Sequence, residues 1–162
     1  MNQELAHSLF EYRNGELYWK IKSCRRDPIG SKAGYFDAAR GYTTIHYERK
    51  RYYLHRLIFL MHHGFLPVEI DHIDTDRTNN KIENLRVCSR SQNGSNRPAQ
   101  SNSKSGIKNV SWSKVRNKWT VFIKSNNKQK NIGGFDDLEL AELVAIMARE
   151  KYHGAYANHV WH

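Results

Sequence analysis

The segment "EIDHIDTDRTNNKIENLRVCSRSQN", residues 69–93, gathers acids, amides and a histidine within an otherwise basic chain. It contains five Asp or Glu residues, although the 162-residue chain carries a formal net charge of +10. Beyond it the contrast is sharp, because there is no Asp or Glu from Asn84 to Phe135. A cluster of acids at one place in a basic chain indicates a specific chemical task.

The basic remainder of the chain favours a polyanionic partner, because lysine and arginine gain free energy by displacing counterions condensed on nucleic acid. Cys24 and Cys88 are too far apart in sequence to indicate a disulfide framework or a cysteine zinc site. The longest apolar run is too short to span a bilayer, and the polar start is unlike a signal peptide, so we expect no membrane partner. The cations expected from this charge to contact nucleic acid include Arg25, Arg26 and Arg97.

The chain is expected to form two globular parts joined by a polar loop. Residues 10–53 contain short alternating stretches separated by glycine turns, which predicts a small β meander. The apolar spacing of "HRLIFLMHHG", residues 55–64, predicts a helix that stops at Gly64. The second part is expected to hold three strands and one amphipathic helix, at residues 108–114, 118–125, 128–135 and 136–154.

Asp71 and His72 are the strongest candidates for chemistry in the opening segment. Hydrolysis of a phosphodiester needs an activated water and a cation that neutralises charge developing on the phosphate. A carboxylate is a hard oxygen ligand for such a cation, and an imidazole can accept a proton near neutral pH. Neighbours on a strand point to opposite faces, so Asp71 is expected to hold a metal while His72 serves as general base.

Residues 55–96 resemble an HNH nuclease of the phage and intron-encoded kind, a homing endonuclease, through "HRL", "IDHID", "RTNNKIENLRVCS" and "SQNGSN". The resemblance implies a β hairpin and a helix around one divalent cation. It also implies Asp71 and Asn93 as metal ligands, His72 as general base, and Asn84 as the residue whose carbonyl orients the imidazole. His55 and Asn80 are secondary candidates, and Asn80 is also expected to pin the loop. Because an amide oxygen is a harder ligand than imidazole, we expect Mg²⁺ or Mn²⁺.

Residues 105–159 resemble the AP2 DNA-binding domain, in which three strands face duplex DNA and a helix backs them. The resemblance rests on "NVSW", "KWTVFI", "IGGF" and "YHGAYAN". It implies that the DNA contacts are Arg116, Lys118, Lys124, Lys128 and Lys130. Trp119 and Phe122 are expected to pack between the sheet and this helix. The fold expected for the whole chain is α+β, with an HNH endonuclease domain at 1–98, a linker at 99–105 and an AP2-like domain at 106–162.

We therefore expect a metal-dependent endonuclease that hydrolyses duplex DNA and nicks one strand per active site. It would act in a cytoplasm, that of the host cell if the gene is phage-encoded, as a monomer or homodimer. The alternative is a non-cleaving, sequence-specific DNA-binding regulator that retains an HNH fold. An RNA-binding module would explain the charge but not the arrangement of Asp71, His72 and Asn93.

Overall fold

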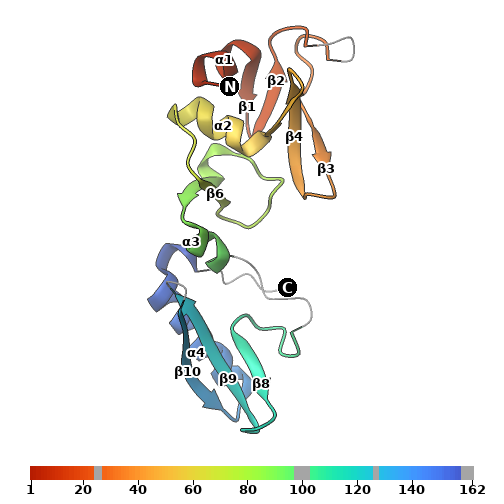
Figure 1. The fold of residues 1–162 in the computed structure, drawn as a ribbon. Helices are drawn as coiled ribbons and strands as arrows, with labels where there is room; N and C mark the ends of the chain where they lie inside the picture. Colours follow the sequence, from red (N-terminus) through yellow and green to blue (C-terminus); the bar gives the residue numbers. More distant parts are fainter. Residues whose placement is uncertain (24–26, 97–102, 126–127, 158–162) are drawn as a thin grey trace. The chain divides into compact units, whose positions relative to one another are not determined.

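The chain has a mixed α/β fold built from several small antiparallel sheets, seen here in a computed structural model (Figure 1). It divides into two compact units, residues 1–87 and 88–162. The structure describes residues 1–23, 27–96, 103–125 and 128–157. The predicted linker at 99–105 falls partly outside the described residues, so the predicted domain limits stay a prediction.

The first unit begins with a short helix and two small sheets in place of one continuous meander. In the β1–β2 hairpin, Asn14 and Gly15 form the turn with φ of 47° and 89°, as their sequence predicts. The elements up to the second helix are α1 (Gln3–Leu9), β1 (Phe10–Arg13), β2 (Glu16–Trp19), β3 (Tyr35–Asp37), β4 (Tyr42–Tyr47), β5 (Lys50–Tyr53) and α2 (Leu54–His63).

Helix α2 supplies much of the first core. Leu57, Ile58 and Phe59 are almost fully buried and pack in one cluster with apolar residues of α1, β1, β2 and β4. The helix ends at Gly64, which adopts a left-handed conformation at φ 78° and donates its backbone N–H to the carbonyl of Leu60. This confirms the predicted helix and its stop.

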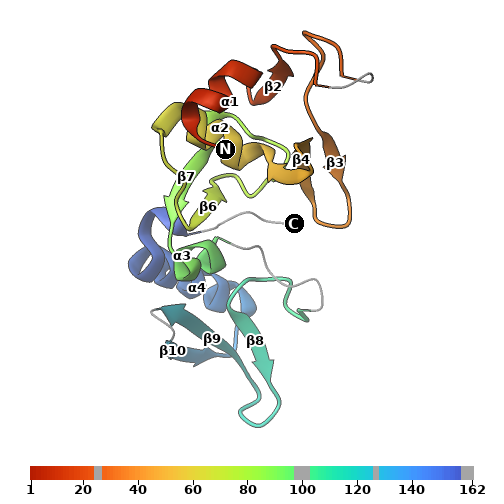
Figure 2. The same ribbon diagram turned by 45° about the horizontal axis from the view of Figure 1, so that its top comes forward.

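Next come two paired strands and a short helix, in the order expected from the nuclease resemblance. They are β6 (Glu69–His72), the 3₁₀ turn η1 (Ile82–Asn84), β7 (Leu85–Cys88) and α3 (Arg90–Ser95). Figure 2 shows β6 and β7 side by side. Ser89 caps α3 through a capping box with Gln92, in which each side chain bonds the other residue's backbone N–H.

The rest of the second unit is a three-stranded antiparallel sheet packed on one helix, as predicted. Its elements are β8 (Val110–Ser113), β9 (Lys118–Ser125), β10 (Lys128–Phe135), α4 (Leu138–His153) and the 3₁₀ turn η2 (Gly154–Tyr156). Val110 and Val121 form the core with Ala141 and Ala145 of α4. The small alanine side chains let the helix approach the sheet closely.

Strand β9 separates two aromatic residues that we expected together in this core. Trp119 and Val121 pack on the α4 side. Phe122 lies between the buried residues Val121 and Ile123, so the alternation of a strand points it to the opposite face. It pairs with Asn131 of β10 there. The expectation that Phe122 joins the core is therefore wrong, because the strand's two-residue period outweighs its hydrophobicity.

Candidate active site

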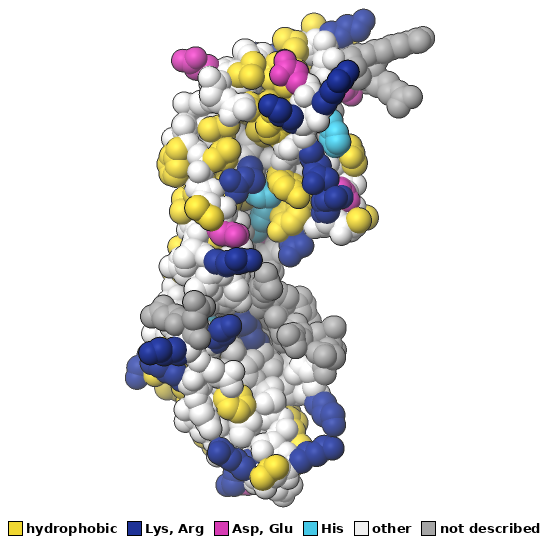
Figure 3. Space-filling model, viewed as in Figure 1, with side chains coloured by type: hydrophobic (Ala, Val, Ile, Leu, Met, Phe, Trp, Pro, Cys, Tyr) yellow, Lys and Arg dark blue, Asp and Glu magenta, His cyan; other side chains and the backbone are white. Residues whose placement is uncertain are grey.

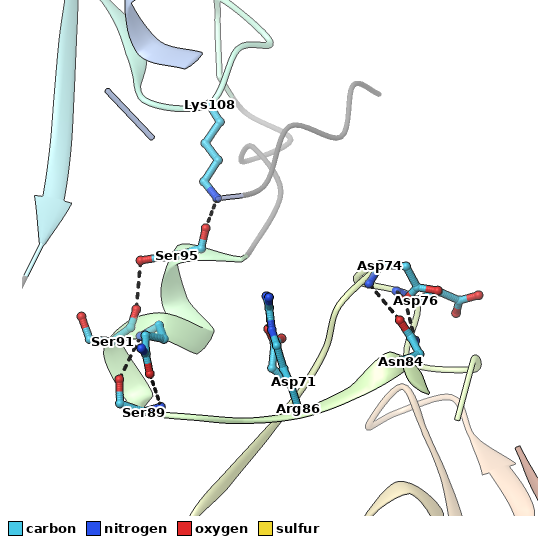
Figure 4. A network of polar contacts seen from close by, with 10 residues as sticks. Asp71, Asp74, Asp76, Asn84, Arg86, Ser89, Ser91, Ser95 and Lys108 are labelled. Carbon is cyan, nitrogen blue, oxygen red and sulfur yellow. Dashed lines mark hydrogen bonds and ion pairs between the residues drawn. The ribbon is translucent and has the colours of Figure 1, made fainter. Parts of the chain in front are cut away.

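Asp71 is a buried carboxylate held by an arginine on the neighbouring strand. The exposed fraction of Asp71 is 6%. The Nε and Nη2 atoms of Arg86, on β7, donate to its Oδ2 at 3.0 and 2.8 Å (Figure 4). A buried carboxylate is stable only with a compensating charge or several hydrogen bonds, and Arg86 supplies both. The pairing of β6 with β7 therefore places the carboxylate of Asp71 beside the positive guanidinium of Arg86.

His72 follows Asp71 on β6, and its ring orientation is set by Asn80. The exposed fractions of these two side chains are 4% and 3%, and His72 Nε2 lies 3.0 Å from Asn80 Oδ1. The Nδ2 of Asn80 donates to the carbonyl of Thr78 at 3.1 Å, which fixes the direction of the amide. Since Oδ1 can only accept, Nε2 must carry the hydrogen. The neutral imidazole then has its lone pair on Nδ1, the atom suited to take a proton.

Aromatic rings pack around His72. His55 meets it edge-on with ring centroids 5.2 Å apart, and Tyr42 lies 6.3 Å away. Burial is the main cause that lowers the pKa of His55 to about 3, with smaller contributions from the charges of His72, Arg56 and Arg77. His55 is therefore a neutral ring near neutral pH, and it packs directly against the candidate base.

Asn84, the expected partner of His72, braces the loop between the strands. Its Oδ1 accepts from the backbone N–H of Asp74 at 3.1 Å, and its Nδ2 donates to Asp74 Oδ1 at 2.8 Å (Figure 4). The same Nδ2 donates to the carbonyl of Asn79 at 2.8 Å. Asn80, the secondary candidate, forms a hydrogen bond with the imidazole. The orienting role of Asn84 stays a prediction, and we propose that role for Asn80 below.

Asp74 is the hub of that loop. Its carboxylate accepts hydrogen bonds from the backbone N–H of Asp76 and from the side chains of Asn79 and Asn84, at 2.9, 2.6 and 2.8 Å. Asp76 in turn accepts from the backbone N–H and hydroxyl of Thr78, and the hydroxyl bond is the main cause that lowers the pKa of Asp76. Several of the acids in this segment thus shape the loop that presents Asn80.

The second expected metal ligand, Asn93, lies in α3 in the second unit. Among the described residues, no three His, Cys, Asp or Glu side chains form a metal-binding group. The predicted pair consists of one carboxylate and one amide, so it is a different kind of donor set. The role of Asn93 stays a prediction from its spacing in the sequence.

The described lysines expected to contact DNA lie on both faces of the second sheet. Arg25, Arg26 and Arg97 lie outside the described residues. In the register of the second sheet, Lys118 and Lys124 share the open face with Phe122, whereas Lys130 pairs with the buried Ile123 on the α4 side. Lys130 Nζ lies 4.6 Å from the centroid of the Tyr152 ring of α4.

The remaining cations complete this picture. Lys128 pairs with Ser125 and falls on the same side as Lys130, while Arg116 is exposed in the β8–β9 turn. Lys118 also forms an ion pair with Asp136 at 3.0 Å. Figure 3 shows Lys and Arg side chains on the visible surface of both units. On the face shown, Lys and Arg side chains are not confined to one of the two units.

Sequence reasoning missed Arg86 and Tyr42 as parts of the site. Arg86 stood within a run of cations that gave no reason to single it out, and its partner depends on the pairing of β6 with β7. Tyr42 lies thirty positions before His72 by residue number, on β4. The spacing of Asp74, Asp76 and Thr78 was a further signal for the loop beside Asn80, because short polar side chains at this spacing bond nearby backbone N–H groups.

The comparisons with known proteins agree with this site. Residues 52–95 match the HNH endonuclease family. The chain is 30% identical over 133 residues to the "Uncharacterized HNH endonuclease L560" of Acanthamoeba polyphaga mimivirus. This alignment covers 80% of this chain and 68% of the relative. The chain is 34% identical over 89 residues to "Protein 3.8" of Escherichia phage T7, covering 55% of this chain and 73% of the relative. The chain belongs to the HNH endonuclease family.

Two further findings concern solved structures and membrane-spanning helices. No solved structure matches the chain. Among the described residues, no helix has the length and apolar character needed to cross a membrane. Family membership indicates a nuclease with DNA as substrate.

Proposed function

We propose that the protein is a divalent-metal-dependent endonuclease that hydrolyses phosphodiester bonds in duplex DNA and nicks one strand per active site. The observation that carries the proposal is the buried pair of neighbours on β6, with Asp71 held by Arg86 and His72 held by Asn80. Together they place an anionic oxygen ligand and an oriented base on adjacent residues of one strand.

His72 is the proposed general base. Asn80 keeps the hydrogen on Nε2, so Nδ1 takes the proton of the water that attacks phosphorus. As the imidazole becomes charged, the carbonyl dipole of Asn80 stabilises the positive ring through the same hydrogen bond. His55 and Tyr42 limit the rotation of the ring and exclude water from its flanks.

The chemistry of Asp71 fits a hard divalent cation, Mg²⁺ or Mn²⁺. Its carboxylate is nearly fully buried and supplies hard oxygen donors, the ligands that such a cation prefers. Asn93 is the proposed second ligand. A bound cation would neutralise the negative charge that develops on the phosphate during attack.

The second unit is the proposed DNA-gripping part, with a likeness to AP2 domains that rests on its sequence motifs and on its three strands backed by one helix. We assign the main contacts to Lys124 on the open face and Arg116 in the β8–β9 turn, both exposed. Lys118, Lys128 and Lys130 would give weaker phosphate contacts. Attraction of this kind is set mainly by charge and positions the duplex without reading bases.

A homing-type role accompanies this proposal, since the motif order matches intron-encoded members. The alternative is a DNA-binding regulator that does not cleave, which is favoured by the exposed cations of the second unit because they require no chemistry. The two functions differ in one property, the appearance of cut strands.

The test is incubation of supercoiled duplex DNA with the full chain in Mg²⁺, in Mn²⁺ and in chelator. We expect metal-dependent conversion to the nicked form, absent in the His72→Ala variant. Tight binding without any cut strand in both metals would support the regulator instead. A uniform double-strand break under single-turnover conditions with equimolar protein would contradict nicking.

A further inference from the structure

Arg86 and Asp71 form an ion pair that competes with the proposed metal for the same oxygen. Two nitrogens of the guanidinium reach Oδ2 of the carboxylate, at 3.0 and 2.8 Å. The side chains of Arg86 and Asp71 are only 16% and 7% exposed, so water screens this pair weakly (Figure 4). Any cation that binds Asp71 therefore enters against a positive charge that is already in place.

Both partners are fixed by the backbone. Asp71 and His72 are the last two residues of β6. Arg86 lies on β7, the strand that pairs with β6. The loop between these strands is braced by Asp74 and Asn84, so the strand ends cannot easily separate. If a divalent cation is to bind Asp71, the flexible part is the arginine side chain.

We propose that Arg86 is an exchangeable cation of the active site, which neutralises Asp71 in the metal-free protein and transfers to a phosphate of the DNA when a divalent cation binds. This inference rests on the proposed function. The planar guanidinium suits the exchange, because its donors match the oxygens of a phosphate as well as those of a carboxylate. Asp71 keeps a positive partner before and after the exchange.

The exchange couples the metal to the substrate. A DNA phosphate that takes Arg86 away from Asp71 lowers the competition for the carboxylate, so DNA strengthens metal binding and metal strengthens DNA binding by the same factor. Without DNA the site keeps its charges balanced internally and holds the metal weakly. Arg86 is then a positioning residue for Asp71 in one state and a phosphate contact in the other.

The test is titration of the full chain with Mn²⁺ alone, without DNA, following free Mn²⁺ by its electron paramagnetic resonance signal. Arg86→Gln removes the competing charge, so we expect it to bind Mn²⁺ at least about fivefold more tightly than the unaltered chain. Arg13→Gln is the matched control, because Arg13 contacts Glu11 through the same two nitrogens, at 3.0 and 2.6 Å, but on an exposed strand. It should leave Mn²⁺ affinity unchanged.

Removal of Arg86 leaves a buried carboxylate that can destabilise the fold, so melting is measured as well. We expect Arg86→Gln to melt lower than the unaltered chain in chelator and to regain more stability in Mn²⁺, because the ion takes over the role of the guanidinium. Arg86→Lys keeps one charge on a flexible stem and should show intermediate Mn²⁺ affinity. This variant provides the affinity test if the glutamine variant fails to fold.

Two failures are distinguishable. If Asp71→Asn leaves Mn²⁺ binding unchanged, the assigned ligand is wrong, and the proposed metal-dependent function loses its basis. If Asp71→Asn abolishes binding but Arg86→Gln, or Arg86→Lys in its place, binds Mn²⁺ no more tightly than the unaltered chain, only the exchange is overturned. Arginine would then serve solely to hold the carboxylate in position.

Discussion

The β6–β7 hairpin and the β8–β9–β10 sheet use polar residues in opposite ways. In the hairpin Asp71, His72 and Asn80 are buried, and each has a named partner within hydrogen-bonding distance. In the sheet, Lys124 and Arg116 are exposed. Burial of polar groups costs free energy unless they are paired, and in return it fixes their geometry. The contrast indicates chemistry in the hairpin and attraction by charge in the sheet.

The largest expected effect comes from the buried base. His72→Ala should lower the nicking rate about a hundredfold or more, because it removes the proposed general base. DNA affinity, measured by fluorescence anisotropy in chelator, should stay within about twofold. His63→Ala, at an exposed histidine near the end of α2, is the control. An equal loss of binding and cleavage in His72→Ala would make this residue structural. The contrast between chemistry in the hairpin and charge attraction in the sheet would then no longer hold.

The second prediction separates the two asparagines of the hairpin. Asn80→Ala should lower the nicking rate about tenfold to a hundredfold with little change in Mn²⁺ affinity, because partners that orient such groups are commonly worth that much. Asn84→Ala removes its hydrogen bonds to Asp74 and Asn79, so it should mainly lower the melting temperature. The reverse pattern, with Asn84 controlling the rate in a stable fold, would restore the assignment made from sequence.

A third prediction concerns pH and the neutral ring beside the base. Because burial lowers the pKa of His55 to about 3 from 6.5, the unfolded chain binds a proton between these values that the folded chain does not. The free energy of unfolding should therefore fall as pH decreases from 6.5 towards 3, with a contribution of up to about 1.4 kcal/mol per pH unit.

The variant His55→Phe keeps a ring and removes this titration. Its denaturant unfolding curves, compared with those of the unaltered chain at several pH values, should show a shallower loss of stability in acid. Identical slopes in the two proteins would mean that His55 is protonated in the folded state, contrary to its burial.

The smallest expected effect lies in the sheet. Lys124→Gln should weaken DNA binding a few-fold and reduce the slope of log affinity against log salt by about one, the signature of one lost phosphate contact. Lys130→Gln should change both less, because Lys130 lies on the α4 side over the ring of Tyr152. A larger effect at Lys130 would show that the duplex meets the other side of the sheet.

Much of the fold was predictable from the sequence, and the reasons are local. Strands β9 and β10 coincide with the predicted ranges 118–125 and 128–135, because a run of strand-forming residues is a local signal. The turn predicted at residues 126–127 lies outside the described residues. Helix α2 ends at Gly64 as predicted. The order of strand, loop, strand and helix in the hairpin region also followed from the resemblance to nucleases.

The site was predictable only in part, because its remaining features depend on side-chain geometry. Asn80 and Asn84 stand four positions apart in one loop, and no local rule determines which of them reaches the imidazole. The pair of Arg86 with Asp71 depends on the pairing of two strands. Phe122 was assigned to the core from its hydrophobicity, although its position in β9 places it on the open face.

The turn at Gly15 gives the hairpin an unexpected neighbour. A side chain on Gly15 would place its first carbon 2.9 Å from the backbone nitrogen of Lys81 and 3.1 Å from the carbonyl carbon of Asn80. Gly15 also has φ of 89°, which favours glycine. The turn at Gly15 therefore lies against the backbone of Asn80, the residue that forms a hydrogen bond with His72. A Gly15→Ala variant is accordingly a rational starting point for a temperature-sensitive nuclease, in which heat switches off cleavage although every catalytic side chain is retained.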